Sequence, residues 1–158
     1  MAKTNAKKIS RDIPLSELTL RKYEKPYKVS RRELVKKLCL SLGLLQPGDS
    51  RDVVVDIFCV LLEAKKAKRD LDSETIRSLV IEHRQKSGLE NEGTASSNIR
   101  RQLRRMRELF FVDKIKNHYK ISEHGSLLHI FEDKIERFLL ASTVDRIKEY
   151  LQEVDYNE

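Results

Sequence analysis

The chain has 158 residues, which is long enough for one domain to bury a hydrophobic core without disulfide or metal crosslinks. Charged residues make up 36% of it, the formal net charge is +7 and the pI is about 9.4, which together favour a polyanionic partner. No apolar run approaches the roughly 18 residues of a membrane span, and the opening MAKTNAKKIS lacks the apolar core of a signal peptide. We therefore expect a cytoplasmic protein that does not enter a membrane.

The positive charge is concentrated in two segments. Counting Lys and Arg against Asp and Glu gives +5 for residues 1–28 and +6 for residues 93–122, but +1 for residues 29–92 and −5 for residues 123–158. We predict a basic N-terminal arm over residues 1–29, disordered over its first 12 residues because these are small, polar and basic. The second basic segment is the candidate binding surface.

Three helices are predicted before this basic segment. An accessory helix begins after Ser30, which has Glu33 at the spacing of a capping box, and the accessory segment ends at residue 48 among Gly and Pro. Residues 52–69 are apolar around most of the helix circumference, with Asp56 and Glu63 on a narrow polar edge, which is typical of a central helix. A third helix is expected over residues 71–88, with Asp72 or Ser73 as its N-cap.

An amphipathic and strongly cationic helix is predicted over residues 94–109. At about 100° per residue, Ile99, Leu103, Met106 and Phe110 fall on one side and indicate a core-facing stripe. The opposite side is polar and carries Thr94, Ser97, Asn98, Arg101, Arg104 and Arg105, with Arg100 and Arg107 on its flanks. The Ser and Thr residues at the start of this helix are candidate N-caps.

Strand-like residues follow this helix. Phe110, Phe111 and Val112 lie before a polar turn at residues 116–118, and Tyr119 to Ile121 lie after it. This pattern predicts a two-stranded β-hairpin with a basic tip.

The order of these elements resembles the winged helix-turn-helix fold, and most closely that of small prokaryotic and archaeal transcription regulators. The resemblance covers about residues 50–130, and the motif Y-x-[IL]-[ST]-x-x-G, common at the end of the wing in that family, is matched by Tyr119, Ile121, Ser122 and Gly125. It implies a mainly α fold with a winged helix-turn-helix core over residues 49–125, a wing over residues 111–122 and additional N- and C-terminal helices. The chain departs from many relatives in having Phe110-Phe111 where they carry Gly.

Residues 126–158 are predicted to form two amphipathic C-terminal helices. The first has apolar residues from Leu127 to Leu139, and the second has a stripe from Val144 to Val154, introduced by Ser142 with Asp145 at capping-box spacing. An intramolecular clamp and a homodimer interface both fit this pattern. We favour the homodimer because DNA-reading helices usually work in symmetric pairs.

The candidate DNA-binding residues lie on the cationic helix and the hairpin. Arg binds guanine bidentately and Asn binds adenine, so the candidate base contacts, near the helix start, are Thr94, Ser97, Asn98 and Arg101. The candidate phosphate contacts are Arg100, Arg104, Arg105 and Arg107 on the helix, and Lys114, Lys116, Asn117, His118 and Lys120 on the hairpin. The arginines could instead form an ordinary solvated face, but such faces mix charges and Glu108 is the only acid among these five arginines.

The sequence offers little for other functions. It has no glycine-rich phosphate loop and no nucleophile or metalloprotease motif, so we expect no catalytic site and no cofactor. Cys39 and Cys59 lack metal-ligand spacing and are expected to be reduced, buried thiols. Two alternatives to a sequence-specific regulator of double-stranded DNA stay open, namely an interaction module for protein or RNA and an architectural or replication DNA-binding protein.

Overall fold

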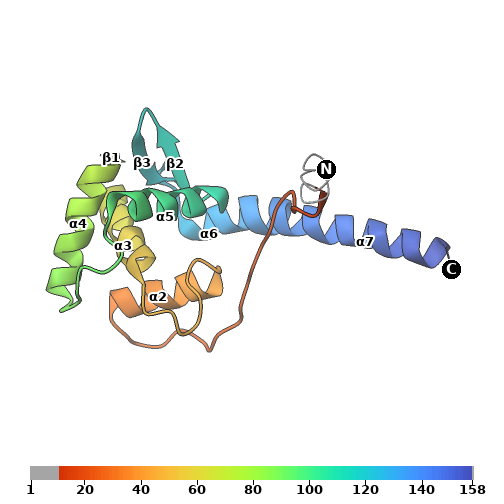
Figure 1. The fold of residues 1–158 in the computed structure, drawn as a ribbon, viewed down its shortest axis with the longest axis horizontal. Helices are drawn as coiled ribbons and strands as arrows, with labels where there is room; N and C mark the ends of the chain where they lie inside the picture. The colour runs from red at the N-terminus through yellow and green to blue at the C-terminus, as the bar shows by residue number, and fades with distance from the viewer. Residues whose placement is uncertain (1–10, 158) are drawn as a thin grey trace, which may run out of the picture.

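The computed structural model describes residues 11–157, and the disorder predicted for residues 1–12 therefore falls almost entirely outside the described residues. The described chain is mainly helical and carries one small antiparallel sheet (Figure 1). The helical elements are α2 (Arg31–Ser41), α3 (Val53–Lys66), α4 (Ser73–Lys86), α5 (Ser96–Glu108), η1 (Ser122–His124), α6 (Leu127–Ile130), η2 (Phe131–Leu140) and α7 (Ala141–Tyr156). The strands are β1 (Leu71–Asp72), β2 (Val112–Ile115) and β3 (His118–Ile121), in the order β1-β3-β2.

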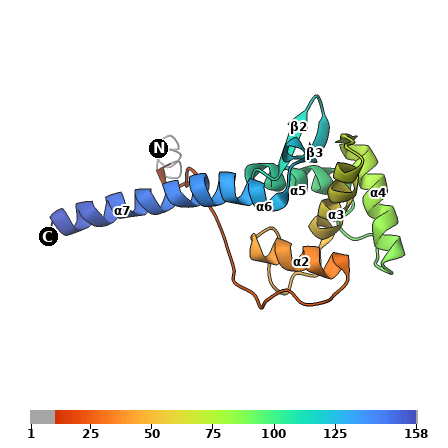
Figure 2. The ribbon, with the colours of Figure 1, turned by 180° about the vertical axis from the view of Figure 1, so that it is seen from behind.

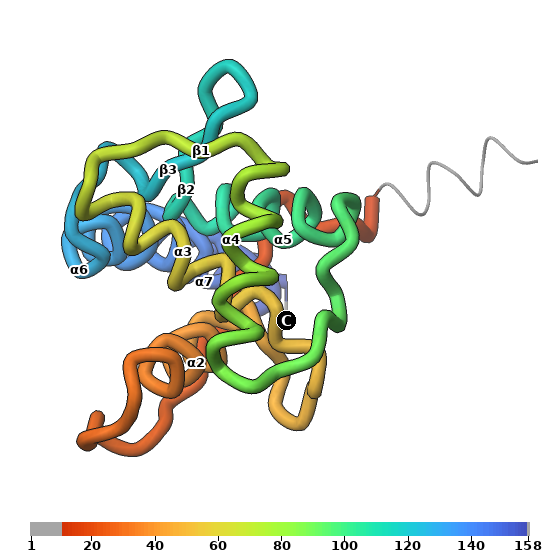
Figure 3. The backbone as a smooth tube through the Cα atoms, turned by 90° about the vertical axis from the view of Figure 1, so that its left-hand side faces the viewer, coloured from red at the N-terminus to blue at the C-terminus, as the bar shows by residue number. Residues whose placement is uncertain are grey.

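Helix α3 is the central element of the core, as its apolar circumference predicts. It packs against α2, α4, α5 and β3, and its Phe58 ring lies 6.0 Å from the ring of Phe111 at the foot of β2. Viewed along the long axis, the β2–β3 hairpin projects from one side of the helices and α2 lies on the opposite side (Figure 3).

The caps expected at Ser30 and Asp72 are present, and the one expected for α5 is wrong. Ser30 Oγ accepts a hydrogen bond from the Glu33 amide at 3.2 Å, and Asp72 Oδ1 accepts one from Thr75 at 2.7 Å. The N-cap of α5, however, is Ala95, which has no side chain that can accept a hydrogen bond from the first turn. Of the Ser and Thr residues predicted to cap this helix, Thr94 donates to the Asn91 carbonyl and Ser96 to Glu74, and Ser97 is exposed.

The hairpin is present and its turn is shorter than the residues 116–118 that we predicted. His118 already pairs with Ile115, so only Lys116 and Asn117 form the turn, with φ of 51° and 64°. Two successive positive φ values are typical of a type I′ turn, which matches the twist of the flanking strands. A third strand, β1, pairs with β3 through Leu71 and Asp72 and was not predicted.

The end of α5 explains the missing glycine before the hairpin. Phe110 adopts a φ of 67°, and the amides of Phe110 and Phe111 donate to the carbonyls of Arg107 and Met106 at 2.9 and 3.1 Å. This is the hydrogen-bond pattern of a Schellman motif, which usually places Gly at the left-handed position. Here Phe110 takes the left-handed conformation, and its ring packs edge-on against Phe138 with the centroids 6.2 Å apart.

The C-terminal region forms one helix rather than the two we predicted. Elements α6, η2 and α7 follow one another without a break from Leu127 to Tyr156 (Figure 1). The predicted capping box at Ser142 is wrong, because Ser142 Oγ donates to the carbonyl of Leu139 inside the helix at 3.1 Å. The middle of this helix, η2, is a π-helix, whose wider turn places Phe131, Ile135 and Leu139 on one side at four-residue spacing.

The long helix is anchored to the domain only by its first part. Ile130, Ile135 and Leu139 are buried, whereas α7 has no buried residue. The segment before α2 runs from beside the long helix to the start of α2 (Figure 2). Arg21 fixes this segment to the C-terminal end of α2 and the turn after it, since its guanidinium donates to the carbonyls of Leu40 and Leu45 at 3.0 and 3.3 Å.

Candidate nucleic-acid interface

Helix α5 presents one buried and one basic side. Ile99, Leu103 and Met106 are fully buried against the core, which confirms these three positions of the predicted apolar stripe; the fourth, Phe110, lies beyond the end of α5 and is half-buried. The exposed side carries Ser97, Arg100, Arg101, Arg104 and Arg107. Among residues 11–157, no carboxylate lies within ion-pair distance of these four arginines. Their charge is therefore available to a polyanion.

The start of α5 is held rigidly on α4. Arg84 Nε donates to the Glu90 carbonyl and Arg77 Nε donates to the Thr94 carbonyl, both at 2.7 Å. Ser96 Oγ lies 2.8 Å from Glu74 Oε1 at the N-terminal end of α4. These bonds fix the angle between the two helices, so the basic side of α5 is positioned before any ligand arrives.

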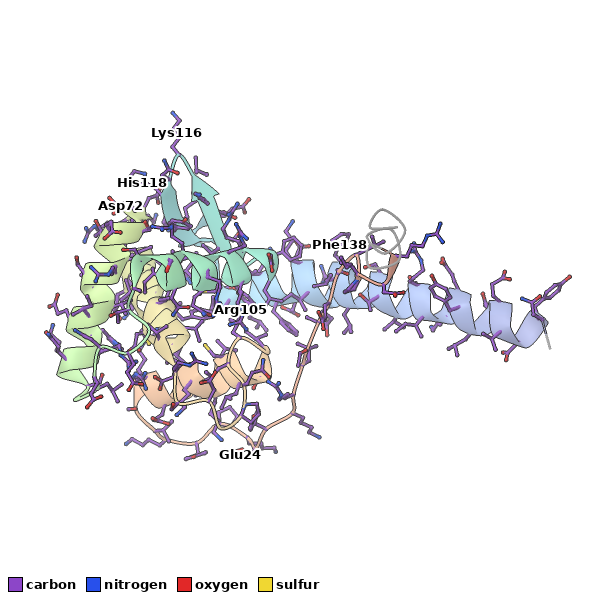
Figure 4. All side chains as sticks on the ribbon, viewed as in Figure 1. Glu24, Asp72, Arg105, Lys116, His118 and Phe138 are labelled. Atoms are coloured by element: carbon purple, nitrogen blue, oxygen red, sulfur yellow. The ribbon has the colours of Figure 1, made fainter. Side chains whose placement is uncertain are left out.

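Three of the candidate contact residues do not lie on the exposed side. Thr94 is only 7% exposed and its hydroxyl donates to the Asn91 carbonyl at 3.2 Å. Asn98 is half-buried, with its amide nitrogen bonded to the Gly93 carbonyl and its amide oxygen to Gln102. Arg105 is also half-buried and points from α5 toward α2 (Figure 4), where it donates to the Gly43 carbonyl at 3.1 Å.

These three residues were misplaced because a helical wheel describes one helix alone. Asn98, Gln102 and Arg105 lie on one flank of α5, where Asn98 bonds to the Gly93 carbonyl in the α4–α5 connection and Arg105 to the Gly43 carbonyl in the turn after α2. Sequence reasoning missed the buried Gln102, which links the other two side chains at 3.2 and 2.8 Å. The sequence signal for a buried Gln102 was its position between the apolar stripe residues Ile99 and Leu103.

The hairpin brings further basic side chains to the same end of the domain. Lys114, Lys116, Asn117 and His118 are exposed, Lys120 is half-buried, and Lys116 points outward from the tip (Figure 4). His118 lies beside Asp72, its partner across the sheet. The hydrogen bond from the Thr75 amide lowers the pKa of Asp72, which keeps a negative charge at the start of α4.

A buried ion cluster supports the helices beneath this surface. Asp56 is fully buried on α3, where it accepts both hydrogen bonds of a bidentate pair with Arg32 at 3.0 Å, one from Arg84 at 2.7 Å and one from His83 at 2.7 Å. Burial opposes its ionisation, but these hydrogen bonds outweigh burial and hold the pKa of Asp56 below its usual range. Of the two residues on the predicted narrow polar edge of this helix, Glu63 is exposed, whereas Asp56 is buried because Arg32 of α2 and Arg84 of α4 close over it.

The described residues offer little for other chemistry. Cys39 and Cys59 are free and buried, and burial raises the pKa of Cys39 and raises that of Cys59 to about 11, so both stay protonated thiols. Within residues 11–157, no cluster of three or more His, Cys, Asp or Glu is arranged to hold a metal ion. No helix in the same range combines the length and apolarity needed to span a membrane.

Comparisons with known protein families, with curated proteins and with solved structures find no match to this chain.

Proposed function

We propose that this protein is a cytoplasmic winged helix-turn-helix DNA-binding protein that regulates transcription. Helix α5 enters the major groove of duplex DNA and the β2–β3 wing follows the neighbouring backbone. The observation that carries this proposal is the exposed side of α5, where four arginines without carboxylate partners lie beside a basic hairpin.

The topology supports the proposal. A central helix, a short strand, two further helices and a hairpin follow one another in the order α3-β1-α4-α5-β2-β3, and β1 joins the sheet beside β3. A winged helix-turn-helix is built in this order, with the helix before the hairpin as the reading helix. A major groove is about 12 Å wide and admits one such helix.

The proposed active form is a homodimer joined through the C-terminal helices. Val144, Ile147, Leu151 and Val154 form an apolar stripe on α7 and are 40% to 61% exposed in the single chain. Exposed apolar stripes of this kind mark interaction sites. Pairing would give the protein two DNA-binding surfaces.

The test is retention of the purified protein on pooled random duplex DNA at two salt concentrations, followed by sequencing of the bound fraction. Binding should weaken with salt by a log–log slope of about 0.9 per phosphate neutralised. Recovery of a motif with two related half-sites supports a dimeric regulator. No retention of duplex DNA contradicts the proposal, and retention of RNA or of acidic protein instead would favour an interaction module.

A pair of charge-reversal variants locates the surface. Arg101→Glu combined with Arg104→Glu should abolish duplex binding, because it places two negative charges against phosphates. Arg31→Glu combined with Lys86→Glu makes the same change in net charge at exposed positions on α2 and α4, outside the proposed interface, and should largely preserve binding. Equal loss in both variants would show that net charge, not α5, drives binding.

One observation favours a second candidate function, an architectural DNA-binding protein. With Thr94 and Asn98 bonded internally, the remaining polar side chains on the exposed side of α5 are Ser97, the arginines and Glu108. Arginine contacts with phosphates carry no sequence information. Salt-sensitive retention without any recovered motif would select this function.

A further inference from the structure

The apolar stripe of α7 is symmetric along the helix. Its four residues are separated by three, four and three positions, so the pattern is the same when the helix is reversed. A reversed copy can therefore place Val144 against Val154 of the partner and Ile147 against Leu151 of the partner. All four residues find apolar neighbours in this single register.

We infer that α7 pairs with α7 of a second copy in antiparallel orientation. This inference rests on the homodimer proposed above and specifies its geometry. An interface of this kind is isologous, because the same surface of each copy meets its own counterpart through a two-fold axis. The axis crosses the pair at the level of Glu149.

The distribution of charge along α7 favours this orientation. Residues 142–149 hold two acids and two bases, and Arg146 already pairs with Glu149 at 2.8 Å, whereas residues 150–156 hold two acids, Glu153 and Asp155, and no base. An antiparallel pair sets the acidic outer half of each helix against the neutral inner half of the other. A parallel pair would set the two acidic halves beside each other, and such like-charge proximity selects against an orientation.

The same charges argue against a membrane surface as the occupant of the stripe. Helices that lie on anionic membranes carry Lys and Arg on their polar face. The polar positions of α7 hold four acids, Asp145, Glu149, Glu153 and Asp155, against two bases. A second copy satisfies both the apolar stripe and its charged flanks.

The orientation determines how far apart the basic surfaces lie. Leu139, the last buried residue of the long helix, is ten positions from the two-fold axis in each copy. At 1.5 Å per residue, the two Leu139 positions are about 30 Å apart along the helix pair. Each domain lies beyond that point, at the opposite end of the long helix from its C-terminus (Figure 1), so the two surfaces are separated by at least about one turn of B-DNA.

Disulfide trapping in the full-length protein tests the orientation. Val144→Cys and Val154→Cys are prepared separately, one with a size tag, and are then mixed and oxidised. In the antiparallel pair the two different cysteines face each other, so the mixed sample should give several times more crosslinked dimer than either variant alone. Identical positions would lie about 15 Å apart along the axis, which exceeds the roughly 7 Å Cα separation that a disulfide spans.

Controls separate this inference from the proposed function. The wild-type protein shows whether its two buried cysteines form crosslinks, and it should stay uncrosslinked. Glu149→Cys should also stay uncrosslinked, because residue 149 lies at the level of the two-fold axis on the side of α7 away from the stripe. Self-crosslinking of each single variant would show a parallel pair and would overturn the inference while leaving the dimer intact. A monomer in sedimentation, with or without binding to phosphatidylserine vesicles, would overturn both the antiparallel pairing and the homodimer. Duplex binding is measured independently, with the Arg101 and Arg104 charge-reversal variant.

Discussion

Asp56 carries its charge inside the hydrophobic core, where an unpaired carboxylate would be strongly unfavourable. The guanidinium groups of Arg32 and Arg84 compensate it, and Asp52 shares both arginines at 3.1 and 3.0 Å. The cluster therefore ties α2 and α4 to the central helix. It also supports the start of α5, since Arg84 additionally holds the connection between α4 and α5.

Replacing Asp56 by Asn should destabilise the protein substantially. The substitution leaves two buried arginines with one carboxylate, and removal of one partner from a buried ion pair typically costs about 3–5 kcal/mol. Urea unfolding at neutral pH measures the free energy of unfolding. The control is Glu63→Gln, which neutralises an exposed carboxylate on the same helix and should change the free energy of unfolding little. An equally small change for Asp56→Asn would contradict the role of the cluster.

The same carboxylate predicts a pH dependence. Because the pKa of Asp56 is lower in the folded than in the unfolded state, its contribution to stability is fully present above the unfolded value of about 4. It is lost as the pH falls through the folded value. Unfolding curves collected from pH 6 downward should show the wild type losing stability more steeply than Asp56→Asn, and parallel curves would exclude Asp56 as a cause.

The sequence predicts single residues well where one helix alone determines their environment. The apolar stripe of α5 and four of its arginines lie where the helical period places them. Thr94, Asn98 and Arg105 were misplaced because their surroundings come from the α4–α5 connection and from the turn after α2. Contacts between segments distant in sequence leave no local pattern, and the same reason hid the partners of Asp56.

At the scale of whole elements, most helices were predictable because each carries a long apolar period. The strand β1 was not, because two residues have no period and form a strand only by pairing with β3. The long C-terminal helix was divided wrongly at Ser142, a residue that can cap a helix or bond back to a carbonyl within one. The local sequence permits Ser142 to take either role. Because the helix continues on both sides of Ser142, its hydroxyl bonds back to a carbonyl and does not cap a new helix.

The β2–β3 turn can be improved, and this gives a prediction for the hairpin as a unit. Lys116 and Asn117 both adopt the left-handed conformation, which is unfavourable for Lys and preferred by Asn-Gly. Lys116→Asn combined with Asn117→Gly should therefore raise stability by about 1 kcal/mol. Thermal unfolding measures the gain in stability. The control, Lys116→Ala with Asn117→Ala, introduces no residue that prefers the left-handed conformation and should show no gain. A loss of stability in the Lys116→Asn, Asn117→Gly variant would argue against this turn type.

At the scale of the whole molecule, the stability of the domain and the proposed self-association involve different parts of one helix. The buried residues of the long helix end at Leu139; beyond it Leu140 and Thr143 are half-buried and the other described residues are exposed in the single chain. An isolated helix of this length is only marginally stable in water, so we expect the outer part to gain order from the proposed pairing.

Two identical substitutions twelve positions apart should separate these roles. Ile135 is fully buried in the core, so Ile135→Ala should lower the free energy of unfolding by about 2–5 kcal/mol at any protein concentration. Ile147 is 53% exposed, so Ile147→Ala should leave unfolding nearly unchanged in dilute solution, where the protein is monomeric, and should shift the dimer to higher concentrations in sedimentation. If Ile147→Ala instead destabilised the dilute protein as much as Ile135→Ala does, α7 would have to pack on its own domain, and the stripe would not be free to meet a second copy.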